Sequence, residues 1–254
     1  MSENAKWYVI HTYSGYENAV KAAAEGMGAI NTQLAEQYDK EFALIQLISD
    51  ETERQQALDQ LNAKYNSDRL AAAQQYQTPF HLYDEAAIRR TARRLKAAFS
   101  GVPEFREYFA VKALPTPAIL RILKDEGCGV DCASMTELML VRACGFQGRD
   151  IMFSANDVPP EEFRLARELN AYINLDDATH VATLRDNGGI PEEVCLRYNP
   201  GDAFTVAGEI MGEPKEAKYG MTRAQLTEAF LRLKELGAKK FGLHAFLASN
   251  TTDS

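Results

Sequence analysis

The stretch YFAVKA, residues 108–113, decides the fold of this chain. Its aromatic and β-branched residues form a short apolar run, which is typical of a buried β-strand. The prolines at positions 115 and 117 end that strand, and residues 118–127 have helical spacing and finish on a glycine. We therefore predict that Lys112 lies where a strand gives way to a helix, which in parallel α/β folds is the edge where ligands bind.

Strand-like and helical patterns alternate around this stretch. Apolar strand-like runs occur at residues 108–112, 129–133, 151–155, 172–175, 194–198 and 241–246. Helical patterns lie between most of them, at residues 117–126, 136–144, 160–170, 178–187 and 223–236. This repetition predicts an α/β fold with a parallel sheet or barrel. A closed (β/α)8 barrel has eight strands, so we expect an incomplete TIM-type barrel of about six strands, preceded by an α-helical segment.

The ammonium of Lys112 has three alternative roles at such an edge. It is a solvated surface charge, a phosphate contact, or an amine that forms a Schiff base. From residue type alone the solvated charge is the commonest of the three, because lysines are mostly exposed.

Further polar residues lie at or just after the other strand ends: Asp131, Asn156, Asp176, Arg197 and His244. Taken singly, the two aspartates are as well explained as helix caps or turn residues. A guanidinium in an apolar strand needs a partner, because burying it alone is costly. A lone histidine is more often structural than catalytic, and we predict that His81 and His180 are surface residues.

The ordered motifs FAVKA, GVDCAS, FSAND, NLDD, LRYNPG and FGLHAF carry a resemblance to a known family. From about residue 78 to 252 the chain resembles the pyridoxal-phosphate (PLP) decarboxylases of the alanine-racemase-like barrel class, and diaminopimelate decarboxylase in particular. The resemblance implies a carboxy-lyase that converts meso-diaminopimelate to L-lysine in lysine biosynthesis, and a homodimer. It implies that Lys112 holds PLP, that His244 stacks on the pyridine ring, and that Asp131 and Arg197 also bind the cofactor.

The chain also departs from that family's pattern. We find neither the last two barrel strands nor the glycine-rich loop and the E-P-G-R motif that bind the phosphate and the ring nitrogen. The usual H-x-G-S segment reads HAFLAS here, at residues 244–249. We therefore expect an incomplete, poorly active decarboxylase. The alternative is a non-enzymatic helical interaction protein in which the barrel portion is scaffold.

The first 77 residues predict different structures, so we expect three domains, at residues 1–23, 24–77 and 78–254. Residues 1–23 resemble the start of transcription factor NusG, with a strand over 7–12 followed by a helix over 17–24, too little to bury a core of their own. Residues 30–77 weakly resemble phage tape-measure helices. An apolar helical stripe begins at residue 30, and Asp50 and Glu53 have the spacing of a capping box. This segment is either two helices or one long helix with a weak joint near Ser49 and Asp50, and it either binds a partner or lies on its own chain.

Composition limits the classes of partner and compartment. The net charge of −8 argues against a nucleic-acid surface or an anionic membrane as the main partner. The four cysteines lack the spacing of a zinc site, so we predict no metal and buried reduced thiols. No apolar run approaches the ~20 residues of a membrane span. We therefore expect a cytoplasmic protein with a small amino acid as its substrate.

Overall fold

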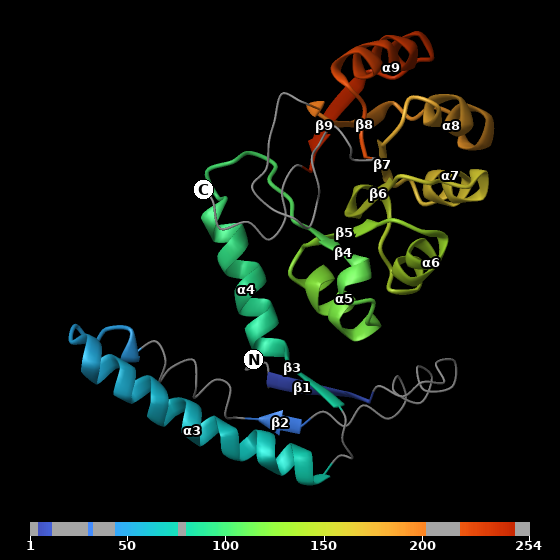
Figure 1. Cartoon of the computed structure of the whole chain (residues 1–254). Coiled ribbons are helices and arrows are strands. Elements are labelled where there is room, and N and C mark those ends of the chain that lie inside the picture. The colour runs from blue at the N-terminus through green and yellow to red at the C-terminus, as the bar shows by residue number, and fades with distance from the viewer. Residues whose placement is uncertain (1–4, 12–29, 33–43, 76–79, 202–218, 247–254) are drawn as a thin grey trace. The chain divides into compact units, whose positions relative to one another are not determined.

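The computed structural model describes residues 5–11, 30–32, 44–75, 80–201 and 219–246 (Figure 1). The chain divides into two compact units, Met1–Thr91 and Ala92–Ser254. The helix predicted over residues 17–24 lies outside the described residues. Within the described part, no helix has both the length and the apolarity needed to cross a lipid bilayer.

The first unit contains a three-stranded sheet in the order β2-β1-β3. Strand β1 (Ala5–His11) pairs antiparallel with both β2 (Ile30–Thr32) and β3 (Phe80–Asp84). The helical stripe predicted to begin at residue 30 is wrong at its start, because Ile30–Thr32 is a strand. β-Branched residues suit a strand, and pairing with β1 satisfies the backbone there, so this tertiary contact overrides the helical spacing.

Helix α3 (Glu51–Gln75) shows where the predicted helical segment divides. The Oδ1 atom of Asp50 accepts hydrogen bonds from the backbone N–H groups of Thr52 at 2.9 Å and Glu53 at 2.8 Å. These bonds satisfy two donors that the first turn leaves free, so the helix begins after Asp50. The predicted joint at this residue is confirmed.

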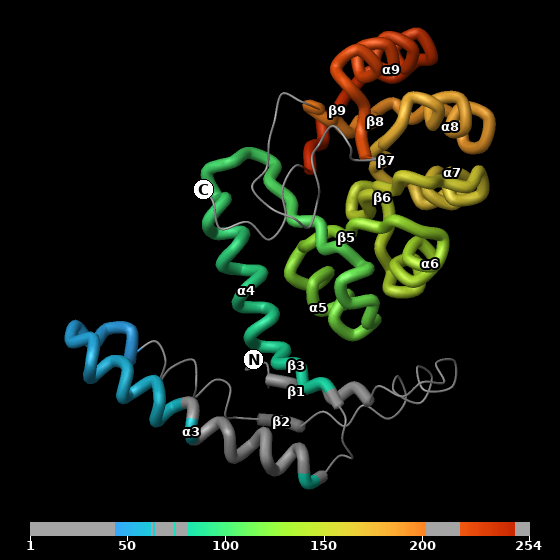
Figure 2. Tube along the Cα trace, viewed as in Figure 1, coloured from blue at the N-terminus to red at the C-terminus, as the bar shows by residue number. Residues whose placement is uncertain are grey.

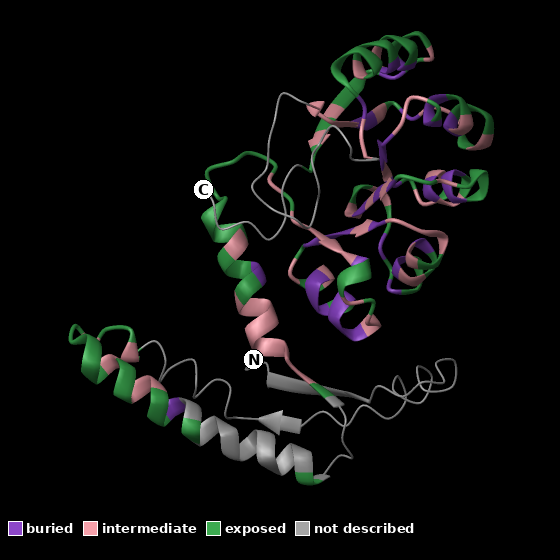
Figure 3. Ribbon diagram, in the orientation of Figure 1, coloured by how far each residue is buried: buried purple, intermediate pink, exposed green. Residues whose placement is uncertain are grey.

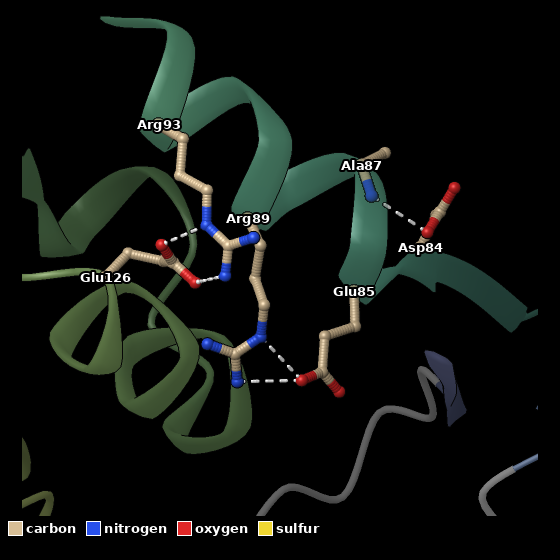
Figure 4. Close-up of polar contacts among 6 residues, drawn as sticks. All are labelled: Asp84, Glu85, Ala87, Arg89, Arg93 and Glu126. Carbon is tan, nitrogen blue, oxygen red and sulfur yellow. Dashed lines mark hydrogen bonds and ion pairs between the residues drawn. The ribbon is translucent and has the colours of Figure 1, made fainter. Parts of the chain in front are cut away.

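Helix α4 (Glu85–Ala98) is capped in the same way. Asp84 accepts a bond from the backbone N–H of Ala87 at 3.0 Å, and Glu85 accepts one from Arg89 Nε at 2.8 Å (Figure 4). Further along the helix, Arg93 donates from Nε and Nη2 to the two carboxylate oxygens of Glu126, both at 2.7 Å (Figure 4). This bidentate pair attaches the last turns of α4 to the residue that ends helix α5 (Pro117–Asp125).

The second unit is built on a parallel sheet in the order β4-β5-β6-β7-β8-β9. Its strands are β4 (Tyr108–Ala110), β5 (Gly129–Cys132), β6 (Ile151–Ala155), β7 (Tyr172–Leu175), β8 (Glu193–Tyr198) and β9 (Lys240–Ala245). The helices that follow α5 are α6 (Met135–Ala143), α7 (Pro160–Glu168), α8 (His180–Gly188) and α9 (Arg223–Glu235). Figures 1 and 2 show the chain stepping from strand to helix to the next strand, with these helices along one side of the sheet. The prediction of an α/β, incomplete TIM-type barrel is confirmed, and the parallel sheet has six strands among the described residues.

The core of this unit lies between the sheet and its helices, where Figure 3 places most of the buried positions. Strand β6 shows why: Ile151, Phe153 and Ala155 are buried, while Met152 and Ser154 between them are only half-buried. Because side chains alternate along a strand, one side of the sheet packs on the helices and the other faces the barrel interior. The same alternation and the strand register place Asp131, Ser154, Asn174, Arg197 and His244 on the interior side.

Strand β4 ends earlier than predicted. It pairs with β5 only over Tyr108–Ala110, and Val111–Ala113 forms a 3-10 turn instead of the strand's last residues. The Val111 side chain is fully buried in the core, and its carbonyl accepts a bond from the N–H of Leu114. The turn replaces the last residues of the predicted strand and places Lys112 at its centre.

Gly129 at the start of β5 allows Tyr108 and the backbone of Asp150 to approach closely, so we expect a larger residue at this position to destabilise the fold. A Cβ atom there would lie 2.7 Å from Tyr108 Cδ1 and 2.9 Å from the carbonyl oxygen of Asp150. The backbone carbonyl cannot easily move, so we expect Gly129→Ala to lower the free energy of unfolding by about 1–3 kcal/mol. Urea unfolding followed by circular dichroism measures this loss. Gly101→Ala is the control, because a Cβ at Gly101 meets nothing within 4 Å; equal stability of the two variants would contradict the prediction.

Candidate active site

The amine of Lys112 lies at the carboxyl edge of the sheet. Its turn directly follows β4, and the side chain is exposed, so the amine is accessible to a ligand. Ala110, two residues earlier, pairs in register with Asp131 of the neighbouring strand β5. The positive charge of Lys112 acts to lower the pKa of Asp131, which shows that the two groups interact.

The side chain of Asp131 is half-buried, with one of its carboxyl oxygens out of contact with solvent. Its Oδ1 atom is buried and has no hydrogen-bond partner. Burial raises the pKa of Asp131 to about 7, against the opposing charges of Lys112 and Arg197 and with a further rise from Glu137. A buried polar atom without a partner is costly, so this oxygen is available to bond a ligand. Asp131 lies within β5, which excludes its interpretation as a helix cap.

Arg197 on β8 has the partner that its apolar strand requires. Its Nη1 atom lies 3.0 Å from Oδ1 of Asp176, and the two side chains are only 11% and 5% exposed. The Oδ2 atom of Asp176 accepts a bond from the backbone N–H of Gly220 at 3.0 Å. The guanidinium also lies over the ring of Tyr219, 4.7 Å from its centroid. Both oxygens of Asp176 are thus occupied, and this aspartate is the anchor of Arg197 rather than a helix cap.

His244 on β9 is held by a short polar chain across the barrel interior. The Nδ2 atom of Asn174 lies 2.9 Å from Nδ1 of His244 and 2.6 Å from Oγ of Ser154. Burial lowers the pKa of His244, and the charge of Arg197 lowers it further, against the opposite effect of Asp176. The imidazole is therefore favoured in its neutral form.

The structure brings together most of the residues singled out from the sequence. The charges of Lys112 and Arg197 both act on Asp131, and Arg197 is paired with Asp176. His244 lies in register with Arg197 on the neighbouring strand. Asn156, by contrast, is exposed just after β6 and lies outside these contacts. The two residues of the polar chain that the sequence analysis missed are Ser154 and Asn174. The sequence feature that could have identified them is a polar residue at an interior-facing position of an otherwise apolar strand.

The prediction that His180 is a surface residue is wrong. It begins α8, is only 8% exposed, and packs edge-to-face on Phe163 with ring centroids 5.7 Å apart. Burial lowers the pKa of His180, and its Nδ1 has no partner among the described residues. All four cysteines are free and buried, as predicted. Within the described residues, no group of acidic, cysteine or histidine side chains could hold a metal ion.

The fold and these residues define a class of protein. An accessible lysine amine, a half-buried acid, an anchored guanidinium and a neutral imidazole meet toward the carboxyl edge of a parallel (β/α) sheet, which is where barrel enzymes bind their ligands. This set suits an aldehyde cofactor with an aromatic ring, because an amine can attach the aldehyde and an imidazole can lie against the ring.

The chain belongs to the pyridoxal-dependent decarboxylases: residues 85–254 match the model of that family's pyridoxal binding domain. It is 39% identical to Protein TabA of Pseudomonas amygdali pv. tabaci over 175 residues, which cover 69% of this chain and 40% of TabA. The crystal structure of diaminopimelate decarboxylase from M. jannaschii superimposes with a TM-score of 0.64 at 25% identity, over 72% of this chain and 45% of that one. The enzyme from Helicobacter pylori complexed with L-lysine gives 0.60 at 28% identity, over 67% and 44%.

The family establishes the cofactor as pyridoxal 5'-phosphate, and the side chains at the sheet edge fit it. The exposed amine of Lys112 can take the aldehyde, and the unpartnered oxygen of Asp131 supplies the free polar atom that a bound ligand would satisfy. The chain spans less than half of the length of the curated relatives that it matches (40% to 47%).

Asp131 predicts a pH dependence of stability. Because its pKa rises from 3.8 to about 7 on folding, the folded chain keeps a proton that the unfolded chain releases between those values. The free energy of unfolding therefore falls as the pH rises through this window. In Asp131→Asn this component is absent, so the variant loses less stability than the wild type between about pH 5 and about pH 8. Parallel thermal melts at the two pH values measure the difference, and identical pH profiles would contradict it.

Proposed function

We propose that residues 78–254 are the cofactor-binding domain of an amino-acid decarboxylase that converts meso-diaminopimelate to L-lysine. The observation that carries the proposal is the placement of Lys112, Asp131 and the Arg197–Asp176 pair toward the carboxyl ends of strands of one parallel sheet. The substrate is supported by the diaminopimelate decarboxylases among the relatives, one of which is crystallised with L-lysine. We place this function in residues 78–254 and none of it in residues 1–23 or 24–77.

Each residue of the site has a role in this proposal. Lys112 binds the cofactor aldehyde through its amine, and His244 lies against the ring as a neutral imidazole. Arg197, fixed by Asp176, adds positive charge beside Asp131 without the freedom to rotate away. When bound, the cofactor supplies an electron sink for the pair left by the breaking Cα–carboxylate bond.

Asp131 has two protonation states close to neutral pH, because burial raises its pKa to about 7. As an acid it can donate from the carboxyl to a ligand oxygen or nitrogen, and as a carboxylate it can accept from a ligand N–H. The charges of Lys112 and Arg197 favour the carboxylate state of Asp131.

The experiment is a titration of the PLP-loaded full chain with amino acids, followed by single-turnover measurement of released carbon dioxide. We expect meso-diaminopimelate to change the cofactor absorbance at a lower concentration than L-ornithine or L-glutamate, and to yield L-lysine. Preference for another amino acid would overturn the proposed substrate. No spectral response to any amino acid by the loaded chain would overturn the proposed reaction.

A further inference from the structure

Asn174 makes two hydrogen bonds from a single atom. It is 3% exposed on β7, between the buried residues Ile173 and Leu175. Its Nδ2 lies 2.6 Å from Ser154 Oγ on β6 and 2.9 Å from His244 Nδ1 on β9. An amide nitrogen carries two hydrogens, so both bonds can be donated at once. This side chain therefore links three strands at one level of the barrel interior.

The direction of these bonds fixes the proton on His244. A ring nitrogen that accepts a hydrogen bond carries no proton, so the proton of a neutral imidazole is on the other nitrogen. We propose that Asn174 is a positioning residue that holds His244 as a neutral imidazole with its proton on Nε2. This inference goes beyond the placement of His244 at the cofactor. It rests on the proposed function in one respect, namely that the ring beside His244 is that of the cofactor.

The reverse orientation of the Asn174 amide is less favourable. With its oxygen toward Ser154 and His244, the amide would require a proton on Nδ1 and would turn both of its N–H groups away from those acceptors. In the observed orientation only the Oδ1 atom is buried without a partner. Leaving two buried donors unpaired costs more than leaving one acceptor, so the donor orientation is preferred.

The larger of the two charge effects on His244 also favours the neutral imidazole. Arg197 lies beside it in register on β8, and Asp176 follows β7 with its Oδ1 bonded to Arg197. The effect of the guanidinium is larger than that of Asp176, and it opposes a second positive charge on the imidazole. A neutral ring with a fixed proton can lie against an aromatic cofactor ring without charge repulsion, which gives the Asn174 contact a role beyond packing.

The proton position is measurable by nuclear magnetic resonance. A two-bond 1H–15N correlation spectrum of the full chain, labelled at its four histidines, reports which ring nitrogen is protonated. The His244 signal is assigned by its absence from His244→Gln. We expect the Nε2–H form in the wild type above the titration range of the ring. In Asn174→Leu the donor is gone, and we expect a mixture of the two forms.

Asn174→Asp tests the same contact with the opposite hydrogen-bond role. A carboxylate can only accept, so we expect the proton to move to Nδ1 and the pKa of His244 to rise by about one unit or more. The matched control is Asn187→Asp, because Asn187 bonds the carbonyl of Thr183 on helix α8. This control is expected to leave the His244 signals unchanged.

Two results would overturn the inference: an Nδ1–H form in the wild type, or an unchanged Nε2–H form in a folded Asn174→Leu chain. If the variants do not fold, the wild-type spectrum alone decides. The outcome is separate from that of the proposed function. An Nε2–H form in a chain that does not respond to amino acids would uphold the role of Asn174 and contradict the proposed decarboxylase function. An Nδ1–H form in an active chain would contradict the role of Asn174 and uphold the decarboxylase function.

Discussion

Replacing Asp176 with alanine is expected to lower the free energy of unfolding by about 3–5 kcal/mol. The substitution removes the partner of Arg197, whose side chain is only 11% exposed, and so leaves a buried guanidinium without a counter-charge. It also removes the acceptor for the backbone N–H of Gly220. Urea unfolding of the full chain, followed by circular dichroism, measures the loss.

The control for this prediction is Asp186→Ala. Asp186 is paired with Arg185 on the surface of α8, where solvent screens the pair, so we expect little change. The double variant Asp176→Leu with Arg197→Met removes both charges, and we expect it to recover much of the stability that Asp176→Ala loses. If Asp176→Ala is no less stable than Asp186→Ala, the ion pair does not hold this edge of the sheet.

Replacing Lys112 with alanine is expected to abolish stable retention of PLP. The exposed amine in the turn after β4 is the group that we expect to attach the aldehyde, and alanine offers no replacement. Cofactor absorbance that remains with the chain after gel filtration measures retention. We expect a loss of about tenfold or more, which corresponds to at least about 1.4 kcal/mol of binding free energy.

Lys239→Ala is the matched control for the lysine substitution. Its amine lies 3.4 Å from Glu192 and is similarly accessible, but it precedes β9 and so lies at the opposite edge of the sheet. We expect this variant to retain PLP as the wild type does. Equal retention by Lys112→Ala and Lys239→Ala would show that the cofactor is not held through Lys112.

Much of the fold could be predicted from the sequence because the local signals agree with one another. Glycines and prolines mark the ends of the strands and helices, and the predicted strand at 151–155 matches β6. The turn at Lys112 was missed because the apolar run continues through Val111, while the pairing of β4 with β5 ends at Ala110. The strand at Ile30–Thr32 was missed because its partner, β1, is distant in the sequence.

The candidate site likewise has a part that could be predicted from the sequence and a part that depends on tertiary structure. The requirement of Arg197 for a partner follows from the cost of burying a charge, and the structure supplies Asp176 in that role. That the partner is this aspartate depends on the register of β7 and β8, which the sequence does not contain. Asn174 was missed because its importance comes from two residues, Ser154 and His244, on strands that are distant from it in sequence.

The most direct test of the account is to incubate the full chain with PLP, reduce it with borohydride, and map the labelled peptides by mass spectrometry. Borohydride makes the attachment of the aldehyde to an amine permanent, so the map reports which lysine holds the cofactor. We predict a single adduct on Lys112. Labelling spread over many lysines, or labelling that omits Lys112, would contradict the placement of the cofactor at the carboxyl edge of the sheet.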